Sequence, residues 1–244
     1  MRVGRGEFLL GDCLDRMSEI PNGSVDMILC DLPYGTTQNK WDAVIPFEPL
    51  WAQYWRVAKS NAAIVLTAQT PFDKLLGASQ IAHLKYEWIW QKTKSTGHLN
   101  AKKQPMKSHE NILVFYRKQC AYNPKMFKGK LHGSGGGKID TSSNYGAQKE
   151  GKRKYQSDMY YPRSIIDFQH ETKPQHPTQK PVDLFAYLIN TYTDPGAVVL
   201  DNCAGSGTTA IAAERTGRNW ICIERDPTYF MQAVMRVSRE VAGQ

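Results

Sequence analysis

Long hydrophobic runs are missing from this sequence: nowhere do 18 apolar residues follow one another, which excludes a membrane-spanning helix. The apolar run near residue 8 is far too short for a signal peptide. Cysteine is also scarce, and the five cysteines are odd in number, scattered and without any CxxC spacing. That pattern indicates neither a disulfide framework nor a zinc site. We therefore expect a cytoplasmic protein with reduced thiols and no bound metal.

The composition is that of a folded globular domain. The 244 residues are 41% hydrophobic and 22% charged, enough to bury a sizeable core without a disulfide or a metal. The net charge of +8 is uneven, because residues 91–180 carry 18 Lys and Arg against 6 Asp and Glu while the rest is slightly acidic. A near-neutral body with one basic segment is typical of a protein that binds a polyanion. Solvated lysine-rich loops are the alternative explanation.

Alternating strand and helix patterns occupy both ends of the chain, and a different pattern separates them. We predict strands at 8–10, 25–30, 62–67, 197–200 and 220–223, helices at 14–20, 51–58, 208–216 and 227–241, and a pair of β segments at 87–91 and 112–116. Strands separated by helices form βαβ units, so the sequence predicts an α/β fold with a doubly wound, mostly parallel sheet. Residues 117–176 contain a glycine run and a charge run at 149–154, which predict a loop-rich insertion.

A glycine-containing segment lies between a predicted strand and a predicted helix, with the sequence Asp201-Asn202-Cys203-Ala204-Gly205-Ser206-Gly207-Thr208-Thr209. Glycines at such a turn let a ligand approach the backbone, and the helix N-terminus offers free N–H groups. Glu224 ends the next predicted strand, where a carboxylate can accept both hydroxyls of a ribose. We interpret the pair as a nucleoside-binding βαβ unit, with a simple strand-to-helix turn as the alternative. NAD is disfavoured because the third glycine of GxGxxG is missing.

A second motif follows the strand predicted at 25–30 and reads Asp31-Leu32-Pro33-Tyr34-Gly35. Its carboxylate and backbone carbonyls converge beside an aromatic ring, which suits an exocyclic amino group on a planar base. Taken alone, these residues are better explained as a proline turn that ends a strand. The other motifs of the chain, and their order, favour the base-binding interpretation.

Together the motifs resemble the amino-group DNA methyltransferases that use S-adenosylmethionine, in the permuted (β) class whose catalytic tetrapeptide precedes the cofactor motif. Asp31-Leu32-Pro33-Tyr34 is similar to the family's [DNS]PP[YFW] tetrapeptide, and residues 201–209 are similar to its DxFxGSGTT loop. His176-Pro177-Thr178-Gln179-Lys180-Pro181 resembles the HPTxKP segment, and Gly11-Asp12 resembles the GD element. Two departures are Leu32 in place of the usual proline and Cys203 in place of the usual phenylalanine. The resemblance spans the chain apart from about residues 120–160.

The resemblance implies a Rossmann-like fold with permuted motif order, S-adenosylmethionine as cofactor, S-adenosylhomocysteine as product and double-stranded DNA as partner. It implies methyl transfer to N6 of a flipped adenine, with cytosine N4, where Ser usually leads the tetrapeptide, as the alternative. The implied catalytic residues are Asp31, Pro33 and Tyr34. The implied cofactor-binding residues are Asp12, Cys30, Asp31, Thr178, Lys180, Asp201, Cys203, Ala204, Gly205, Ser206, Gly207, Thr208, Thr209, Glu224 and Arg225. Those expected to contact DNA are Lys102, Lys103, Lys107, Lys152, Arg153 and Lys154.

The same resemblance divides the chain. Residues 1–116 would form the catalytic half of one domain, 117–175 a basic target-recognition insertion, and 176–244 the cofactor-binding half. No Pro-Cys dipeptide is present, which disfavours a cytosine carbon-5 methyltransferase because that reaction needs a thiolate nucleophile. A non-catalytic DNA-binding relative is the second hypothesis, motivated by Leu32, and a protein or RNA methyltransferase is the third. The resemblance also implies a prokaryotic or phage-encoded protein, and it is compatible with a homodimer and with a cognate restriction endonuclease as a partner.

Overall fold

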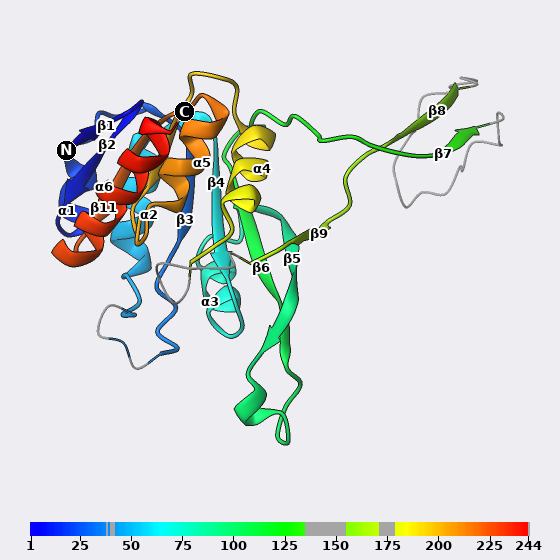
Figure 1. Ribbon diagram of the computed structural model, residues 1–244, viewed down its shortest axis with the longest axis horizontal. Coiled ribbons are helices and arrows are strands. Elements are labelled where there is room, and N and C mark those ends of the chain that lie inside the picture. Colours follow the sequence, from blue (N-terminus) through cyan, green and yellow to red (C-terminus); the bar gives the residue numbers. More distant parts are fainter. Residues whose placement is uncertain (38, 40–41, 135–154, 171–178, 244) are drawn as a thin grey trace. The chain divides into compact units, whose positions relative to one another are not determined.

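The computed structural model describes residues 1–37, 39, 42–134, 155–170 and 179–243. Within these residues one sheet has nine strands in the order β1-β2-β11-β10-β3-β4-β6-β5-β9 (Figure 1). The strands are β1 (Arg2–Val3), β2 (Gly6–Leu10), β3 (Val25–Asp31), β4 (Ala58–Ala68), β5 (Leu84–Thr96), β6 (Lys107–Phe115), β9 (Ile165–Phe168), β10 (Val198–Asp201) and β11 (Asn219–Glu224). The run from β2 to β4 is parallel, β6 is antiparallel to β4 and β5, and β9 is parallel to β5. The sheet is therefore mostly parallel, as the sequence predicts.

Helices cover both faces of this sheet. One face packs against α1 (Cys13–Ser18), α2 (Phe47–Val57) and α3 (Phe72–Ser79), and the other against α4 (Val182–Tyr192), α5 (Thr208–Thr216) and α6 (Pro227–Ala242). Side chains of strand β3 pack alternately on the two faces of the sheet. Met27 and Leu29 belong to one apolar cluster, and Ile28 and Cys30 belong to the other. The predicted doubly wound α/β fold is confirmed. None of the helices in the described ranges is long and apolar enough to cross a membrane.

The order of strands places the two ends of the chain next to each other. Strands β2, β11, β10 and β3 are neighbours, which is the arrangement expected for the permuted motif order that the resemblance implies. Because β3, β10 and β11 are parallel, Asp31, Asp201 and Glu224 end their strands at the same edge of the sheet. In open α/β sheets, ligands bind at the carboxyl edge.

Several elements were not predicted. Helices α3 and α4 each follow a proline, Pro71 and Pro181, that occupies the N-cap position. Strands β5 and β6 are longer than predicted and form a hairpin that closes through a short 3-10 helix, η1 (His98–Asn100). Residues 93–96 of β5 are exposed, so this part of the hairpin has no apolar alternation that could indicate a strand.

The chain forms two compact units, one of residues 1–123 and 164–244 and the other of residues 124–163. In the second unit, β7 (Phe127–Ser134) pairs antiparallel with β8 (Tyr155–Tyr160). Strand β9 also comes from the segment predicted as an insertion, but it pairs with β5 in the main sheet. The charge run at 149–154 lies outside the described residues.

Candidate active site

A cavity of about 360 Å³ opens at the carboxyl edge of the parallel strands. Its walls come from the ends of β3, β10 and β11, the start of α5, the segment before α4 and the hairpin of β5 and β6. The predicted site residues that line it are Asp12, Asp31, Pro33, Tyr34, Lys180, Asp201, Cys203, Ala204, Gly205, Ser206, Thr208, Glu224 and Arg225. The fold therefore brings the two predicted motifs to one cavity, although 170 residues separate Asp31 from Asp201.

The two glycines of the loop after β10 have different roles. Gly205 has a φ of +51°, and a Cβ there would meet no atom within 4 Å, so this backbone leaves open space beside the cavity. Gly207 has a φ of +77°, and a Cβ there would lie 3.2–3.3 Å from side-chain atoms of Val237, Ala233 and Phe8. Gly205 thus leaves room for a ligand, whereas Gly207 allows the loop to pack against α6 and β2.

The carboxylate of Asp201 holds this loop rather than pointing at an open space. Its Oδ1 accepts a hydrogen bond from the backbone N–H of Cys203 at 3.0 Å, and its Oδ2 accepts one from the hydroxyl of Thr209. Burial raises the pKa of Asp201 to about 6, despite these two donors. Thr209 therefore supports the loop through Asp201.

Glu224 lies at the end of β11 and borders the same cavity. Its Oε2 accepts the Gly205 N–H at 2.8 Å, and its Oε1 accepts the Asp226 N–H at 2.9 Å. Burial raises the pKa of this carboxyl group, while the backbone donors oppose the rise. The two N–H groups fix the orientation of a carboxylate that can still accept further hydrogen bonds from a ligand in the cavity.

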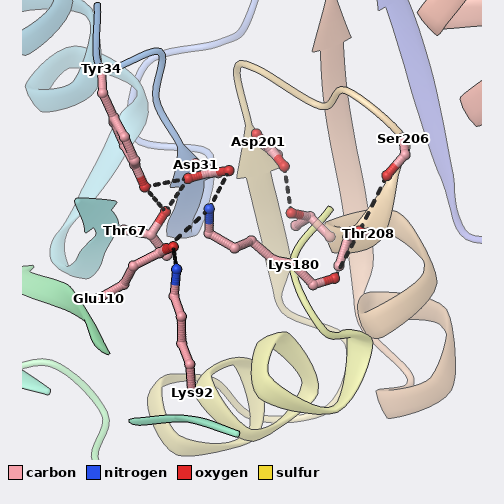
Figure 2. A network of polar contacts seen from close by, with 10 residues as sticks. Asp31, Tyr34, Thr67, Lys92, Glu110, Lys180, Asp201, Ser206 and Thr208 are labelled. Carbon is pink, nitrogen blue, oxygen red and sulfur yellow. Dashed lines mark hydrogen bonds and ion pairs between the residues drawn. The ribbon is translucent and has the colours of Figure 1, made fainter. Parts of the chain in front are cut away.

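Asp31 lines the same cavity and is the centre of a polar network (Figure 2). Its Oδ1 accepts hydrogen bonds from the hydroxyl of Tyr34 at 2.6 Å and from that of Thr67. Its Oδ2 pairs with Nζ of Lys180 at 2.7 Å. Each oxygen of the carboxylate therefore has its own type of donor, neutral hydroxyls on one side and an ammonium group on the other.

The ammonium group of Lys180 continues the network to Glu110 on β6 and Lys92 on β5 (Figure 2). Lys180 Nζ lies 3.2 Å from Glu110 Oε2, and Lys92 pairs with Glu110 Oε1. Burial alone would lower the pKa of Lys180, but Asp31 and Glu110 outweigh it and the pKa is raised. Burial alone would raise the pKa of Glu110, but Lys180 and Lys92 outweigh it and the pKa is lowered. Lys180 and Glu110 are therefore both charged at neutral pH.

Aromatic side chains form the wall beside this network. The ring of Tyr34 stacks on Phe72 with centroids 5.2 Å apart, and Lys180 Nζ lies 5.6 Å from the centroid of the Tyr34 ring. Trp90 and His170 also line the cavity, with ring centroids 4.8 Å apart. Planar rings around a group of acceptors form a surface that suits a flat, polar ring such as a nucleobase.

Some predicted site residues lie elsewhere. Cys30, Gly207 and Thr209 are not among the residues that line the cavity, and Cys30 is fully buried in the apolar layer with burial raising its thiol pKa to about 12. Lys102 and Lys103 are exposed just after η1. Lys107 donates a hydrogen bond to Gln69. Thr178, Lys152, Arg153 and Lys154 lie outside the described residues. Among the residues that the structure describes, no group of three or more His, Cys, Asp or Glu side chains could hold a metal ion.

Sequence reasoning assigned no site role to Thr67, Lys92, Trp90 or Glu110, although the segment His109-Glu110-Asn111 before an apolar strand is also similar to the family. The register of the hairpin pairs Trp90 with Glu110, and the adjacent residue on the same face of β5 is Lys92. A glutamate at the start of an apolar strand was the available signal, since a buried carboxylate requires a partner. The alternation of Trp88, Trp90 and Lys92 was a second signal.

The parallel sheet brings the glycine-containing loop after β10 and the carboxylate at the end of β11 to one cavity. These features define an α/β protein with a site for a nucleotide-like ligand. The chain belongs to the DNA methylase family of the N6 and N4 amino-methyltransferases, whose family model matches residues 25–235. This match includes both motifs and the whole network around Asp31.

Three known proteins illustrate the relationship. The type II methyltransferase M.HinfI of Haemophilus influenzae is 26% identical over 262 residues, which cover 96% of this chain and 68% of that protein. The protein in the crystal structure of the M1.HpyAVI–SAM complex has 21% sequence identity to this chain. The two structures match with a TM-score of 0.64 over 95% of this chain and 99% of that chain. The cytosine-N4-specific PvuII DNA methyltransferase has 15% sequence identity to this chain. Its structure matches with a TM-score of 0.69 over 99% of this chain and 94% of that chain. The predicted Rossmann-like methyltransferase fold is thereby confirmed.

Proposed function

We propose that this protein transfers a methyl group from S-adenosylmethionine to the exocyclic N6 of an adenine that is flipped out of double-stranded DNA. The observation that carries the proposal is the position of Asp31. Its carboxylate lies in the same cavity as the Gly205 loop and Glu224, so an amino group and a nucleoside cofactor can meet there. We infer that the protein acts in the cytoplasm of a prokaryotic cell. Formation of a homodimer and pairing with a cognate restriction endonuclease remain predictions from the resemblance.

The residues present fit S-adenosylmethionine. Gly205 leaves open space where a side chain would otherwise fill the cavity, and Glu224 presents a carboxylate suited to the two ribose hydroxyls. Ser206 and Thr208, at the start of α5, offer hydroxyl groups beside a helix N-terminus, which suits the carboxylate of the methionine part. Asp12 lies at the cavity on the segment between β2 and α1, where it can contact the adenine of the cofactor.

The cofactor supplies an electrophilic methyl group on a sulfonium, and the electron pair of the broken carbon–sulfur bond stays on sulfur. The exocyclic amine of a base is a poor nucleophile because its lone pair is delocalised into the ring. Oδ1 of Asp31 and the backbone carbonyl of Pro33 accept the two amine hydrogens, which directs the lone pair toward the methyl carbon. As the N–C bond forms, the amine nitrogen releases one proton to Oδ1 of Asp31. No covalent bond to the protein is needed.

Tyr34 and the basic segment serve the substrate. Flipping a base out of the duplex costs a few kcal/mol, and stacking on an aromatic ring offsets part of that cost. The exposed Lys102 and Lys103 can neutralise DNA phosphates near the mouth of the cavity, since they extend from the hairpin whose base lines it.

Two features favour adenine over cytosine by analogy with the family: Asp rather than Ser leads the tetrapeptide, and a Lys-rich segment ends in His109-Glu110-Asn111. The test is digestion of DNA incubated with the protein and S-adenosylmethionine, followed by mass spectrometry of the nucleosides. N6-methyldeoxyadenosine is the expected product. N4-methyldeoxycytidine would overturn the choice of adenine, and binding of DNA without any methylated nucleoside would favour the non-catalytic relative. Replacing DNA with RNA in the same assay tests the third hypothesis.

A further inference from the structure

Lys180 is the one ammonium group that contacts both Asp31 and Glu110, as far as the described residues show. Its side chain is 7% exposed, and Nζ lies 2.7 Å from Asp31 Oδ2 and 3.2 Å from Glu110 Oε2. The resemblance to known methyltransferases assigns Lys180 to the cofactor. In the structure, however, its charge is directed toward the carboxylate that meets the substrate amine (Figure 2).

We propose that Lys180, Glu110 and Lys92 are positioning residues that hold the Asp31 carboxylate in the orientation required for methyl transfer. This inference rests on the proposed function, in which Asp31 accepts a hydrogen from the target amine. Lys180 holds Oδ2, so that Oδ1 remains the oxygen directed toward Tyr34, Thr67 and the amine. A misplacement of about 1 Å in such a group can reduce a rate about 100-fold.

Glu110 competes with Asp31 for the charge of Lys180. Because Lys92 pairs with Oε1 of Glu110, the longer 3.2 Å contact to Oε2 leaves Lys180 closer to Asp31. Removing Lys92 would leave the buried Glu110 with Lys180 as its remaining cation, and Lys180 would be drawn away from Asp31. Lys92 therefore acts on Asp31 through two intermediate residues, without contacting the substrate.

The network joins two lysines, Lys92 and Lys180, to two carboxylates, Glu110 and Asp31. The side chains of Lys92, Glu110 and Lys180 are each at most 8% exposed, so little water can replace a lost partner. Removing one member leaves an unpaired charge, whereas removing Lys92 and Glu110 together leaves the neutral pair of Asp31 and Lys180. This symmetry provides a test that separates positioning from simple loss of a contact.

The experiment compares Lys180→Met, Lys92→Met, Glu110→Gln and the double variant Lys92→Met/Glu110→Gln. Lys85→Met is the matched control, because Lys85 is an exposed lysine on the same strand as Lys92. The single-turnover methylation rate at saturating DNA and cofactor is measured for each variant. Calorimetry gives the cofactor Kd, and thermal denaturation reports folding.

We expect Lys180→Met to slow single-turnover methylation about 100-fold and Lys92→Met about 10-fold, with the cofactor Kd within about threefold of wild type. The double variant should recover to within about threefold of the wild-type rate, and Lys85→Met should be unchanged. A Lys180→Met protein with weakened cofactor binding and an unchanged rate would overturn the proposal. So would a double variant that is as slow as the product of the single variants.

A second measurement does not require activity. The unfolding equilibrium constants of wild type, Asp31→Asn, Lys92→Met and the combined variant form a double-mutant cycle, which remains available if Lys180→Met does not fold. Asp31 and Lys92 are not in direct contact, so the network predicts a non-additivity of at least about threefold transmitted through Lys180 and Glu110. Strict additivity would overturn the inference. If the wild-type protein methylates no DNA, the proposed function fails. The network is still tested in that case, because this cycle measures the coupling between Asp31 and Lys92 without any activity.

Discussion

The hydroxyl of Tyr34 donates a 2.6 Å hydrogen bond to Oδ1 of Asp31, the same oxygen that accepts the hydroxyl of Thr67. Both parts of this aromatic residue of the tetrapeptide therefore contact the site: its ring stacks on Phe72, and its hydroxyl donates to the carboxylate. Burial and the nearby Asp31 charge raise the pKa of Tyr34, so this hydroxyl remains a donor throughout the neutral range.

Tyr34 should tolerate substitution by another aromatic residue. In Tyr34→Phe the hydroxyl of Thr67 still donates to Oδ1, so methylation should fall only a few-fold. Tyr34→Ala removes the stacking surface, worth about 1–3 kcal/mol or roughly 5- to 150-fold in the rate. The measurement is kcat/KM on DNA for both variants. Equal damage by both substitutions would show that the hydroxyl has a direct role in the reaction.

Glu224→Ala should weaken cofactor binding. The loss of a charge-assisted hydrogen bond to the ribose costs about 1.5–3 kcal/mol, or roughly 10- to 150-fold in Kd. Glu224→Gln is the matched variant, because an amide oxygen can still accept the N–H of Gly205 and support the loop. Calorimetry should place it between wild type and Glu224→Ala. Unchanged Kd values for both variants would refute the assignment of Glu224.

Substitution of Gly207 should destabilise the fold more than substitution of Gly217. Both have positive φ, so alanine costs about 1–2 kcal/mol of unfolding free energy at either position. A Cβ at Gly217 would meet no atom within 4 Å, whereas at Gly207 it would press on Val237, Ala233 and Phe8 and add about 1–3 kcal/mol. Urea unfolding of the two alanine variants measures the difference, and equal losses would contradict the packing role of Gly207.

Asp201 should make stability depend on pH in the acid range. Its pKa is about 6 in the folded protein and lies near 3.9 in an unfolded chain, so the folded state binds the proton more tightly. Its stabilising contribution is therefore present below about pH 4 and is lost as pH rises to about 6, by roughly 3 kcal/mol. The difference in unfolding free energy between wild type and Asp201→Asn, measured from pH 4 to 7, should show this slope. A pH-independent difference would contradict it.

Lys102 and Lys103 should contribute to DNA affinity without contributing to sequence choice. If both contact phosphates, replacing them with Ala flattens the slope of log K against log salt by up to about 2. The preference for one methylation site over others should hardly change, since phosphate contacts carry no direct sequence information. Lys85→Ala is the control, and an unchanged slope in the double variant would show that these lysines are merely solvated.

Local patterns were sufficient to predict the parallel sheet and to locate the two motifs, whereas the base-binding interpretation of the Asp31 motif depended on the family resemblance. Asp31, Asp201 and Glu224 each follow an apolar strand directly, so their shared edge could be inferred from the pattern of strands and helices. That β2, β3 and the C-terminal βαβ unit lie side by side is expected from the permuted motif order that the resemblance implies, and the structure supplies their order, β2-β11-β10-β3.

The network around Asp31 could not be predicted in this way. Its members come from five separate segments, and Lys180 lies 149 residues from Asp31 in the sequence. Glu110 faces Lys92 because of the register of β5 and β6, and no local spacing in either strand specifies that register. The hydroxyl of Thr67 reaches Asp31 because β3 and β4 pair in parallel with these two residues opposite each other.

The most direct test of the account is methyl transfer by Asp31→Ala, measured with labelled S-adenosylmethionine and DNA beside calorimetry of cofactor binding. Because the Asp31 carboxylate acts on the target amine, the variant should lose methyl transfer, by at least about 100-fold, while its cofactor Kd stays within a few-fold of wild type. Substantial turnover in a folded Asp31→Ala protein would contradict the assignment of Asp31 and, with it, the proposed mechanism.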